Sequence, residues 1–503
     1  MVSIRLRPIP FFKRARHLHI GTTLKQQYTY NYNYAPRKWP RRLLYFGVGT
    51  LITSGYIYYA WWPKHTFPLS VAKILRKGLW AESDRGENDY QLALKYYIMA
   101  LEHCDEIGMD SLSDEYTGIQ LKVAEMFERL DQKESAEFIY NEIATLYMKV
   151  LTAAPDSEDG RRIATPEHRA HLIQKDLRIA IKLVELNNLN PLLSKAILMT
   201  HLLIAQDEVH KKLGPSGTIY KMTAISDDDK TPQNYNATIK HDSITVSTDG
   251  VVTLINKNPA AWYPFSDEFF NAMDLLTAIC VATGDLGMAS RVKISMTEWM
   301  LLADVDPHKL LLSQCNLASL LYLQAEEFEA QEIGFRRKLA ESAGLDYDTI
   351  KTLTPKTVQE LQDAKEMVQK MMEKGSAEDK AEYQEAIANK DKCIGLSVET
   401  YQSVLEFAKK LPQEIIENNS TINETVALAT YGLGVVHLHL SQYEKAERLL
   451  REARVRSRSC GYEGLIAEIE RELGKLFKER KLRQQGQAGL GEVDIEMDIH
   501  INK

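Results

Sequence analysis

Three groups of residues have types that occur in metal, dinucleotide or calcium sites, and their spacing argues against each kind of site. His437 and His439 would lie about 200° apart on a helix, too far apart for one metal ion. Gly432 and Gly434 follow no predicted strand and lack the third glycine of a dinucleotide-binding loop. Residues 227–229 are adjacent aspartates, unlike the alternating ligands of a calcium loop. We therefore predict no catalytic residue, no cofactor site and no metal site.

The cysteines also point away from chemistry. They are few, odd in number and widely spaced, at Cys104, Cys280, Cys315, Cys393 and Cys460. This pattern argues against a disulfide scaffold or a cysteine-based zinc site, and it predicts plain buried thiols. The sequence also holds no phosphate-binding P-loop, no H-E-x-x-H and no G-x-S-x-G motif. A binding module is the first hypothesis, and an enzyme is the second.

The charge of the chain is divided sharply along its length. Its 503 residues carry 62 Lys+Arg and 69 Asp+Glu, for a net charge of −7, and the first acidic residue is Glu82. The 81 residues before Glu82 carry 14 basic residues, so the segments before and after this boundary carry +14 and −21. The acidic segment disfavours nucleic-acid binding, since that would need a basic surface.

The first part of the basic segment, residues 1–25, has the composition of a mitochondrial targeting sequence. It contains no acid, and Arg5, Arg7, Lys13, Arg14 and Arg16 alternate with apolar residues. A basic disordered tail is the alternative interpretation, because Pro8 and Pro10 would interrupt a helix. Residues 26–42 are predicted to be a basic spacer.

Residues 43–62, from Leu43 to Trp62, contain no charged side chain. Twenty residues at about 1.5 Å each cross the ~30 Å hydrocarbon core of a bilayer. Aromatic residues lie at both ends, as in an interfacial belt, and four basic residues come just before the segment. Gly49 and Thr53 form a small-xxx-small pair, which allows a second helix to approach closely. We predict a transmembrane helix, with a buried soluble helix as the alternative.

The orientation of this span follows from the flanking charges. Ten basic residues precede the span, and only a few follow it before the acidic bulk begins. The more positive side of a span stays inside, which for a mitochondrial inner-membrane protein is the matrix. The chain is therefore predicted to place its N-terminus in the matrix and its acidic bulk in the intermembrane space.

From residue 69 onward, apolar residues recur at helical spacing. A small residue on one helix and another twelve positions later would let two helices cross closely, while bulky residues one turn away fill the neighbouring gaps. The predicted packing residues are Ala93, Tyr97, Ala100, Ala124, Phe127, Ala136, Tyr140, Leu433, Gly434, Tyr443, Ala446 and Ala453. This pattern resembles the tetratricopeptide repeat, a 34-residue helix–turn–helix unit. The predicted fold class is all-α, a degenerate superhelix of such repeats; a generic helical bundle is the alternative.

One segment interrupts the helical pattern. Asp249 and Gly250 lie between apolar runs at 244–246 and 251–255, which predicts a small β-hairpin inserted between repeats. The predicted order after the span is N-terminal repeats (69–210), loop and hairpin insertion (211–260), central helical repeats (261–350), a helical linker region (351–423), a C-terminal repeat with capping helix (424–482), and an unpacked tail (483–503). Residues 350–395 are rich in Lys, Glu and Gln, which predicts exposed long helices there.

Three stretches of the first repeats, at 73–77, 93–97 and 112–122, resemble a fungal family of tetratricopeptide-repeat subunits of the mitochondrial i-AAA protease supercomplex. The layout of targeting segment, single span and repeats covers nearly the whole chain, and the specific residues lie mainly in 73–150 and 424–460. The resemblance implies an inner-membrane adaptor for protein quality control. Such a subunit acts with the AAA protease and a second small membrane adaptor subunit. It contacts inner-membrane lipid and delivers unfolded or unassembled membrane proteins for degradation.

The alternative function is an outer-membrane import receptor or chaperone-docking protein that faces the cytosol. Chaperone-binding repeats hold a C-terminal carboxylate with a lysine and an asparagine at fixed positions around the small residue of the first helix. None of the corresponding positions carries the expected residue; they are Gly78, Glu82, Leu121, Glu125, Tyr431 and Val435. The sequence therefore favours the adaptor.

Overall fold

The computed structural model describes residues 50, 53–56, 66–187, 190–217, 221–224, 238–239, 243–248, 251–345, 366, 369–370 and 373–486. The chain divides into two units, Met1–Phe67 and Pro68–Lys503. The predicted targeting segment (1–25), the spacer (26–42) and nearly all of the predicted tail lie outside the described residues.

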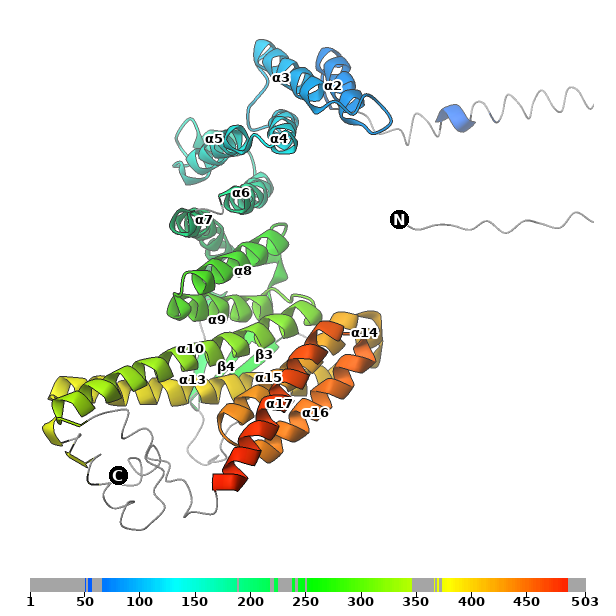
Figure 1. Cartoon of the computed structure of the whole chain (residues 1–503). Helices are drawn as coiled ribbons and strands as arrows, with labels where there is room; N and C mark the ends of the chain where they lie inside the picture. Colours follow the sequence, from blue (N-terminus) through cyan, green and yellow to red (C-terminus); the bar gives the residue numbers. More distant parts are fainter. Residues whose placement is uncertain are drawn as a thin grey trace, which may run out of the picture. The chain divides into compact units, whose positions relative to one another are not determined.

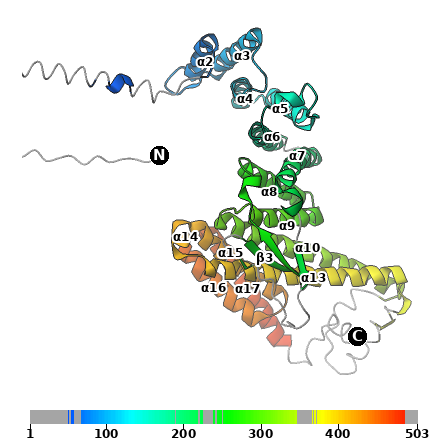
Figure 2. The same ribbon diagram turned by 180° about the vertical axis from the view of Figure 1, so that it is seen from behind.

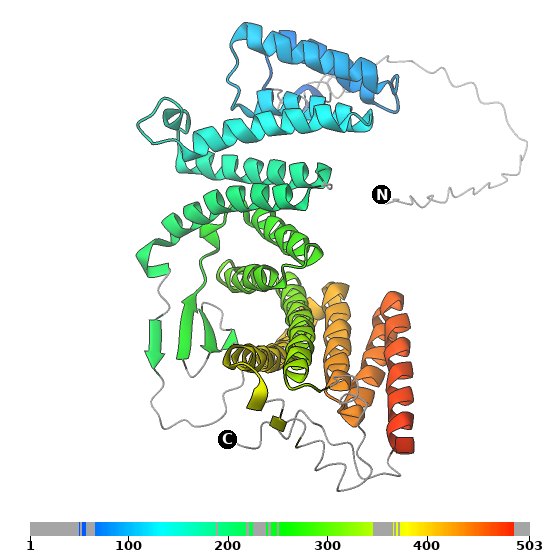
Figure 3. The same ribbon diagram turned by 60° about the vertical axis from the view of Figure 1, so that its left-hand side comes forward.

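The second unit is mainly helical, which confirms the helical prediction for the described residues from Leu69 on. Its first helices are α2 (Leu69–Glu82), α3 (Tyr90–Ile107), α4 (Asp114–Arg129), α5 (Lys133–Thr152), the 3-10 turn η1 (Gly160–Arg162), α6 (Pro166–Leu186) and α7 (Pro191–Gly217). The later ones are the 3-10 turn η2 (Pro259–Ala261), α8 (Ser266–Ala282), α9 (Leu286–Leu302), α10 (Pro307–Ser342), α13 (Ala377–Lys410), α14 (Gln413–Asn418), α15 (Ser420–His439), α16 (Tyr443–Cys460) and α17 (Glu463–Gly486). Helices adjacent in sequence pack on one another from α2 through α10 (Figure 3).

The turns between these helices follow from local sequence. The Asp89 carboxylate accepts hydrogen bonds from the backbone N–H groups of Gln91 and Leu92, both at 3.0 Å, and so caps the start of α3. Gly108 and Gly461 end α3 and α16 with φ of 71° and 75°. Most residues avoid this left-handed conformation because of their Cβ atom, so glycine is favoured at both helix ends.

Two glycines allow close helix crossings near the two ends of the array. A Cβ at Gly78 of α2 would lie 2.8 Å from the Tyr97 ring of α3. A Cβ at Gly434 of α15 would lie 3.0 Å from Leu450 of α16. Both distances are below ordinary contact, so a larger residue would have to displace its neighbour.

The two longest helices, α10 and α13, lie side by side along much of their length (Figure 1). The Glu332 carboxylate of α10 is buried and accepts a hydrogen bond from the Lys390 ammonium of α13 at 2.6 Å. Tyr383 and Ala386 of α13 are also buried. The prediction of exposed long helices in 350–395 is therefore wrong for one side of α13, because that apolar side packs against α10. Beyond this pair, α15, α16 and α17 pack together (Figure 2).

Where the structure describes the insertion, four strands form one antiparallel sheet in the order β1-β4-β3-β2. They are β1 (Lys221–Ala224), β2 (Thr238–Ile239), β3 (Ser243–Thr248) and β4 (Val251–Asn256). Thr248 pairs with Val251, on either side of Asp249 and Gly250 in the sequence. The described residues of the insertion thus include a sheet of four strands, larger than the two-stranded hairpin that the sequence predicts.

Among the described residues, none of the helices has both the length and the apolar character needed to cross a bilayer. Of the residues predicted to mark the span, Leu43, Gly49 and Trp62 lie outside the described residues. Thr53 lies in a short helical stretch, where its hydroxyl donates a hydrogen bond to the Thr50 carbonyl at 3.2 Å.

Candidate binding cavity

The predicted packing residues fall into clusters that follow the chain. Ala93 and Tyr97 of α3 pack with Phe127 of α4. Ala124, Ala136 and Tyr140 share the large central core, to which Phe127 also contributes, and Ala446 and Ala453 pack with Tyr443 near α17. Ala100 and Gly434 are buried, and Leu433 lies in the core between α10, α13 and α15. These residues hold helices together, and none lines the cavity described below.

The histidine and glycine pairs of α15 occupy packing environments. His437 is half-buried, and burial lowers the pKa of its imidazole. His439 instead lies beside Tyr322, with 3.3 Å between its Nδ1 and the tyrosine hydroxyl. A Cβ at Gly432 would lie 2.3 Å from the Tyr401 ring. In the described part of the chain, no three His, Cys, Asp or Glu residues are grouped to hold a metal ion.

The prediction of buried thiols is confirmed for Cys104, Cys280, Cys315 and Cys393, while Cys460 is half-buried. Burial raises the pKa of the first four thiols, and it raises that of Cys315 to about 12. A thiol with a raised pKa carries little thiolate, the reactive form, so these cysteines are suited to packing.

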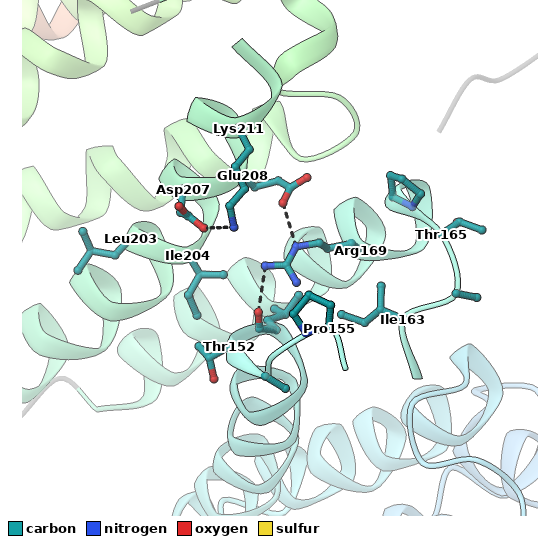
Figure 4. Close-up of a pocket in the computed structure, with 14 residues that line it drawn as sticks. Thr152, Pro155, Ile163, Thr165, Arg169, Leu203, Ile204, Asp207, Glu208 and Lys211 are labelled. Atoms are coloured by element: carbon teal, nitrogen blue, oxygen red, sulfur yellow. Dashed lines mark hydrogen bonds and ion pairs between the residues drawn. The ribbon is translucent and has the colours of Figure 1, made fainter. Parts of the chain in front are cut away.

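The cavity lies where the end of α5, the connection to α6 and the second half of α7 meet (Figure 4). Its volume is about 740 Å³. Most of the lining is apolar, from Leu151, Ala153, Pro155, Ile163, Ala164, Pro166, Leu203 and Ile204. Thr152, Thr165, Arg169, Asp207, Glu208 and Lys211 complete it.

The four charged side chains of the cavity are paired with one another. The Arg169 guanidinium donates a hydrogen bond from Nε to Glu208 at 2.9 Å and another to the Leu151 carbonyl at 2.9 Å (Figure 4). That carbonyl belongs to the last turn of α5, where no intrahelical donor follows. The Lys211 ammonium lies 2.5 Å from the Asp207 carboxylate. The lining thus presents apolar surface beside two ion pairs whose charges cancel, and it contains no histidine or cysteine.

An exposed apolar stripe on α7 leads into this cavity. Leu192, Ala196, Met199 and Leu203 follow one another at intervals of four, three and four residues, so they lie on one side of the helix. Leu192 is 73% exposed and Leu203, which also lines the cavity, is 60% exposed. Such a surface suits the apolar side of a helical or extended protein segment.

The apolar stripe of α7 is visible in the sequence, although neither the motifs nor the packing residues of the repeats predict a site there. The stripe is visible in the stretch 191–203 as a second apolar face, in addition to the face that packs. Only burial distinguishes the two faces, since Leu198 and Leu202 of the same helix are 0% and 2% exposed.

Comparison with known proteins identifies the family. Residues 154–305 match the family described as the MGR3 middle domain. A Saccharomyces cerevisiae protein, the mitochondrial inner membrane i-AAA protease supercomplex subunit MGR3, is 32% identical over 467 residues, which cover 90% of this chain and 85% of that protein. The chain belongs to the MGR3 family. A second Saccharomyces cerevisiae protein, named Protein MRG3-like, is 29% identical over 468 residues, 90% of this chain and 92% of that protein.

This membership confirms the family that the sequence resembles. Most of the cavity lies in the region that matches the family model. All of its lining residues except Leu151, Thr152 and Ala153 fall in the MGR3 middle domain. The exposed stripe of α7 falls there as well.

Solved helical-repeat structures show only a distant likeness to this MGR3-family chain. The tetratricopeptide domain of P58(IPK) is 12% identical, with a TM-score of 0.14 over 82% of this chain and 99% of that one. Yeast Tom70 is 10% identical, with a TM-score of 0.11 over 82% and 97%. Scores this low carry no argument about the fold, so the architecture rests on the helices described above.

Proposed function

We propose that this chain is a non-catalytic adaptor subunit of the mitochondrial i-AAA protease supercomplex. It binds unfolded or unassembled membrane-protein segments through its helical array and promotes their degradation by the protease. A second small membrane subunit acts with it.

The observation that carries this proposal is the cavity with its exposed stripe on α7. Leu192, Met199 and Leu203 expose apolar surface to solvent, and the nearby charges are neutralised by internal pairs. An unfolded membrane protein is rich in apolar segments, so its chemistry matches this surface. Because the lining combines apolar side chains, two threonines and charged side chains that are already paired, it suits binding better than catalysis.

The anchoring part of the proposal rests on residues 43–62. The uncharged segment would cross the inner membrane once, with the N-terminus in the matrix and the repeats in the intermembrane space. This arrangement would bring the cavity to the side where an intermembrane-space protease works.

The alternative, a receptor that holds a C-terminal carboxylate, is disfavoured by two glutamates. Glu82 accepts a hydrogen bond from the Tyr97 hydroxyl at 2.6 Å and from the Lys122 ammonium at 3.1 Å. Glu125 accepts hydrogen bonds from Lys122 and Arg129, both at 2.7 Å. The carboxylates occupy these cations and would repel an incoming carboxylate.

The substrate site can be tested with the full-length protein in detergent and a labelled, 20-residue apolar peptide. Leu203→Glu should weaken peptide binding about tenfold, because it places a charge in the apolar contact. Phe138→Glu is the matched control: Phe138 is 70% exposed on α5, about 20 Å along the helix from the cavity residue Leu151. Equal weakening by both variants, or by neither, would remove the cavity from the proposal.

The assembly and location need separate measurements. Affinity purification of the chain from mitochondrial membranes should bring down an AAA protease, with and without Leu203→Glu. The repeats should resist external protease in intact mitochondria and become sensitive when the outer membrane is ruptured. Digestion in intact mitochondria would favour the cytosol-facing receptor instead.

A further inference from the structure

The outer face of α2, made of Leu69, Lys73, Arg76, Lys77 and Trp80, differs from the rest of the array. Leu69, Lys73, Arg76 and Trp80 follow at intervals of four, three and four, so they form one stripe along the helix. Leu69 is 72% exposed and Trp80 is 58% exposed. The opposite face, with Val71, Gly78 and Ala81, is buried against the next helix.

This face is basic and free of acid, within an acidic unit. From residue 68 to the end, the chain carries 51 basic and 69 acidic residues, a net −18. Yet the first three charged residues of this part are Lys73, Arg76 and Lys77. None of the three makes an ion pair among the described residues, and Lys77 only lies over the Tyr96 ring at 5.9 Å. The cations are therefore available to an anionic partner.

The position of α2 in the array leaves this face uncovered by any other described helix. The first helix of a stacked array has a neighbour on one side only, and its outer face is normally polar to keep the protein soluble. Here that face instead combines an indole, a leucine and three cations. Tryptophan, lysine and arginine together are typical of helices that lie at a membrane surface.

The spacing in the sequence limits how far α2 can move from the predicted span. Six residues, 63–68, separate the last residue of the span from the start of the helix. Extended backbone covers at most about 3.5 Å per residue, so this connection reaches about 20 Å. A helix on such a tether stays close to the headgroups of the bilayer that holds the span.

We infer that the outer face of α2 binds the surface of a bilayer that contains anionic phospholipid. Lys73, Arg76 and Lys77 pair with headgroup phosphates, while Trp80 and Leu69 enter the interface between headgroups and acyl chains. The inference rests on the proposed single span, which brings α2 to the bilayer.

The test uses the full-length chain in nanodiscs of phosphatidylcholine, alone or with phosphatidylglycerol, with brominated acyl chains as contact quenchers of tryptophan. The signal of Trp80 is the difference between the wild-type chain and Trp80→Phe. We expect this signal to be quenched more strongly with anionic lipid. The increase should be lost in the triple variant Lys73→Glu, Arg76→Glu and Lys77→Glu, since it reverses the attraction.

The matched control reverses three exposed lysines elsewhere, Lys392, Lys478 and Lys481. It changes the net charge equally and should keep the quenching. Circular dichroism checks that both triple variants are folded. Three results would overturn the inference: Trp80 unquenched in both lipids, equal quenching in both, or equal loss in the two triple variants.

Alkaline extraction of membranes tests the span independently. A chain that is extracted lacks the anchor, which contradicts the proposed function. A chain that resists extraction, with Trp80 unquenched, keeps its anchor and contradicts only the role of α2.

Discussion

The first and last helices of the array, α2 and α17, solve the same packing problem with different outer surfaces. Each end of the array contains a tight glycine crossing, between α2 and α3 at Gly78 and between α15 and α16 at Gly434. The exposed side of α17 carries both signs of charge, and it includes an ion pair between Arg471 and Glu468, one turn apart on the helix. The outer face of α2 has cations and an indole instead.

The difference separates two roles that an end helix can have. An end helix whose surface carries both signs of charge is stable in solvent without a partner, because its charges neutralise each other and remain hydrated. The α2 end exposes Trp80 beside cations that make no ion pair within the described part of the chain, so it is suited to a partner. The helix that follows the predicted span is thus the one whose surface fits a membrane.

The largest effect should come from filling the two glycine crossings. Gly78→Leu and Gly434→Leu should each cost about 2–3 kcal/mol of folding stability. Even a Cβ added at these positions would lie 2.8 Å and 3.0 Å from a neighbouring side chain, and leucine is larger still. Each change should loosen only its own end, because stability in a stacked array is a sum of local contacts. Hydrogen exchange measured helix by helix tests this. If Gly78→Leu also loosened α16 and α17, the ends would not be independent.

The next effect concerns a hydrogen bond that ties α2 to α3. The Tyr97 hydroxyl donates to the Glu82 carboxylate at 2.6 Å, and burial together with this carboxylate raises the pKa of Tyr97. Tyr97→Phe should destabilise the α2 end by about 1.5 kcal/mol, because a hydrogen bond to a charged group is lost. Denaturant unfolding, followed by exchange of the α2 and α3 amides, measures it. Tyr263→Phe, at a residue 76% exposed, should change nothing.

A smaller effect should appear when the pH is lowered. Burial favours the neutral form of Glu125, but hydrogen bonds from Lys122 and Arg129 outweigh it and hold the pKa of Glu125 below its ordinary value of 4.5. The stabilisation is complete above that value and is lost as the pH falls through the lowered pKa. Because Glu125 is partly exposed, Glu125→Gln should cost about 0.5 kcal/mol at pH 7 and nothing near pH 2. Unfolding curves at both pH values decide; equal costs at both would exclude the ion pairs as the cause.

The smallest effect should follow from trimming the outer faces themselves. Trp80→Ser in α2 and Phe477→Ser in α17 replace side chains that are 58% and 47% exposed. Each should change the free energy of unfolding by less than about 0.5 kcal/mol, since surface positions contribute little to the fold. Thermal unfolding in detergent tests this. A large loss for Trp80→Ser would mean that its face is structural, which would contradict the comparison.

The spacing of small and bulky residues along a helix is a local property of the sequence. The small residues Ala93, Ala124 and Ala446 recur at helical spacing beside bulky ones, and all three are 0% exposed. Close crossing needs little more than a missing side chain at the right interval, so sequence alone reports it. The four-stranded order of the sheet could not be read in this way, because β1 pairs with β4 about thirty residues later in the chain.

The sequence by itself determined the charge division, the uncharged segment 43–62, the helical array and the family resemblance, because each is a property of residue type and spacing along the chain. Only the tertiary structure decided which apolar face of α7 is exposed, which charges around Arg169 are neutralised, and that α13 packs on α10. The physical reason is that exposure and pairing depend on neighbours distant in sequence. Arg169 meets Glu208 from a different helix, and no local pattern encodes that contact.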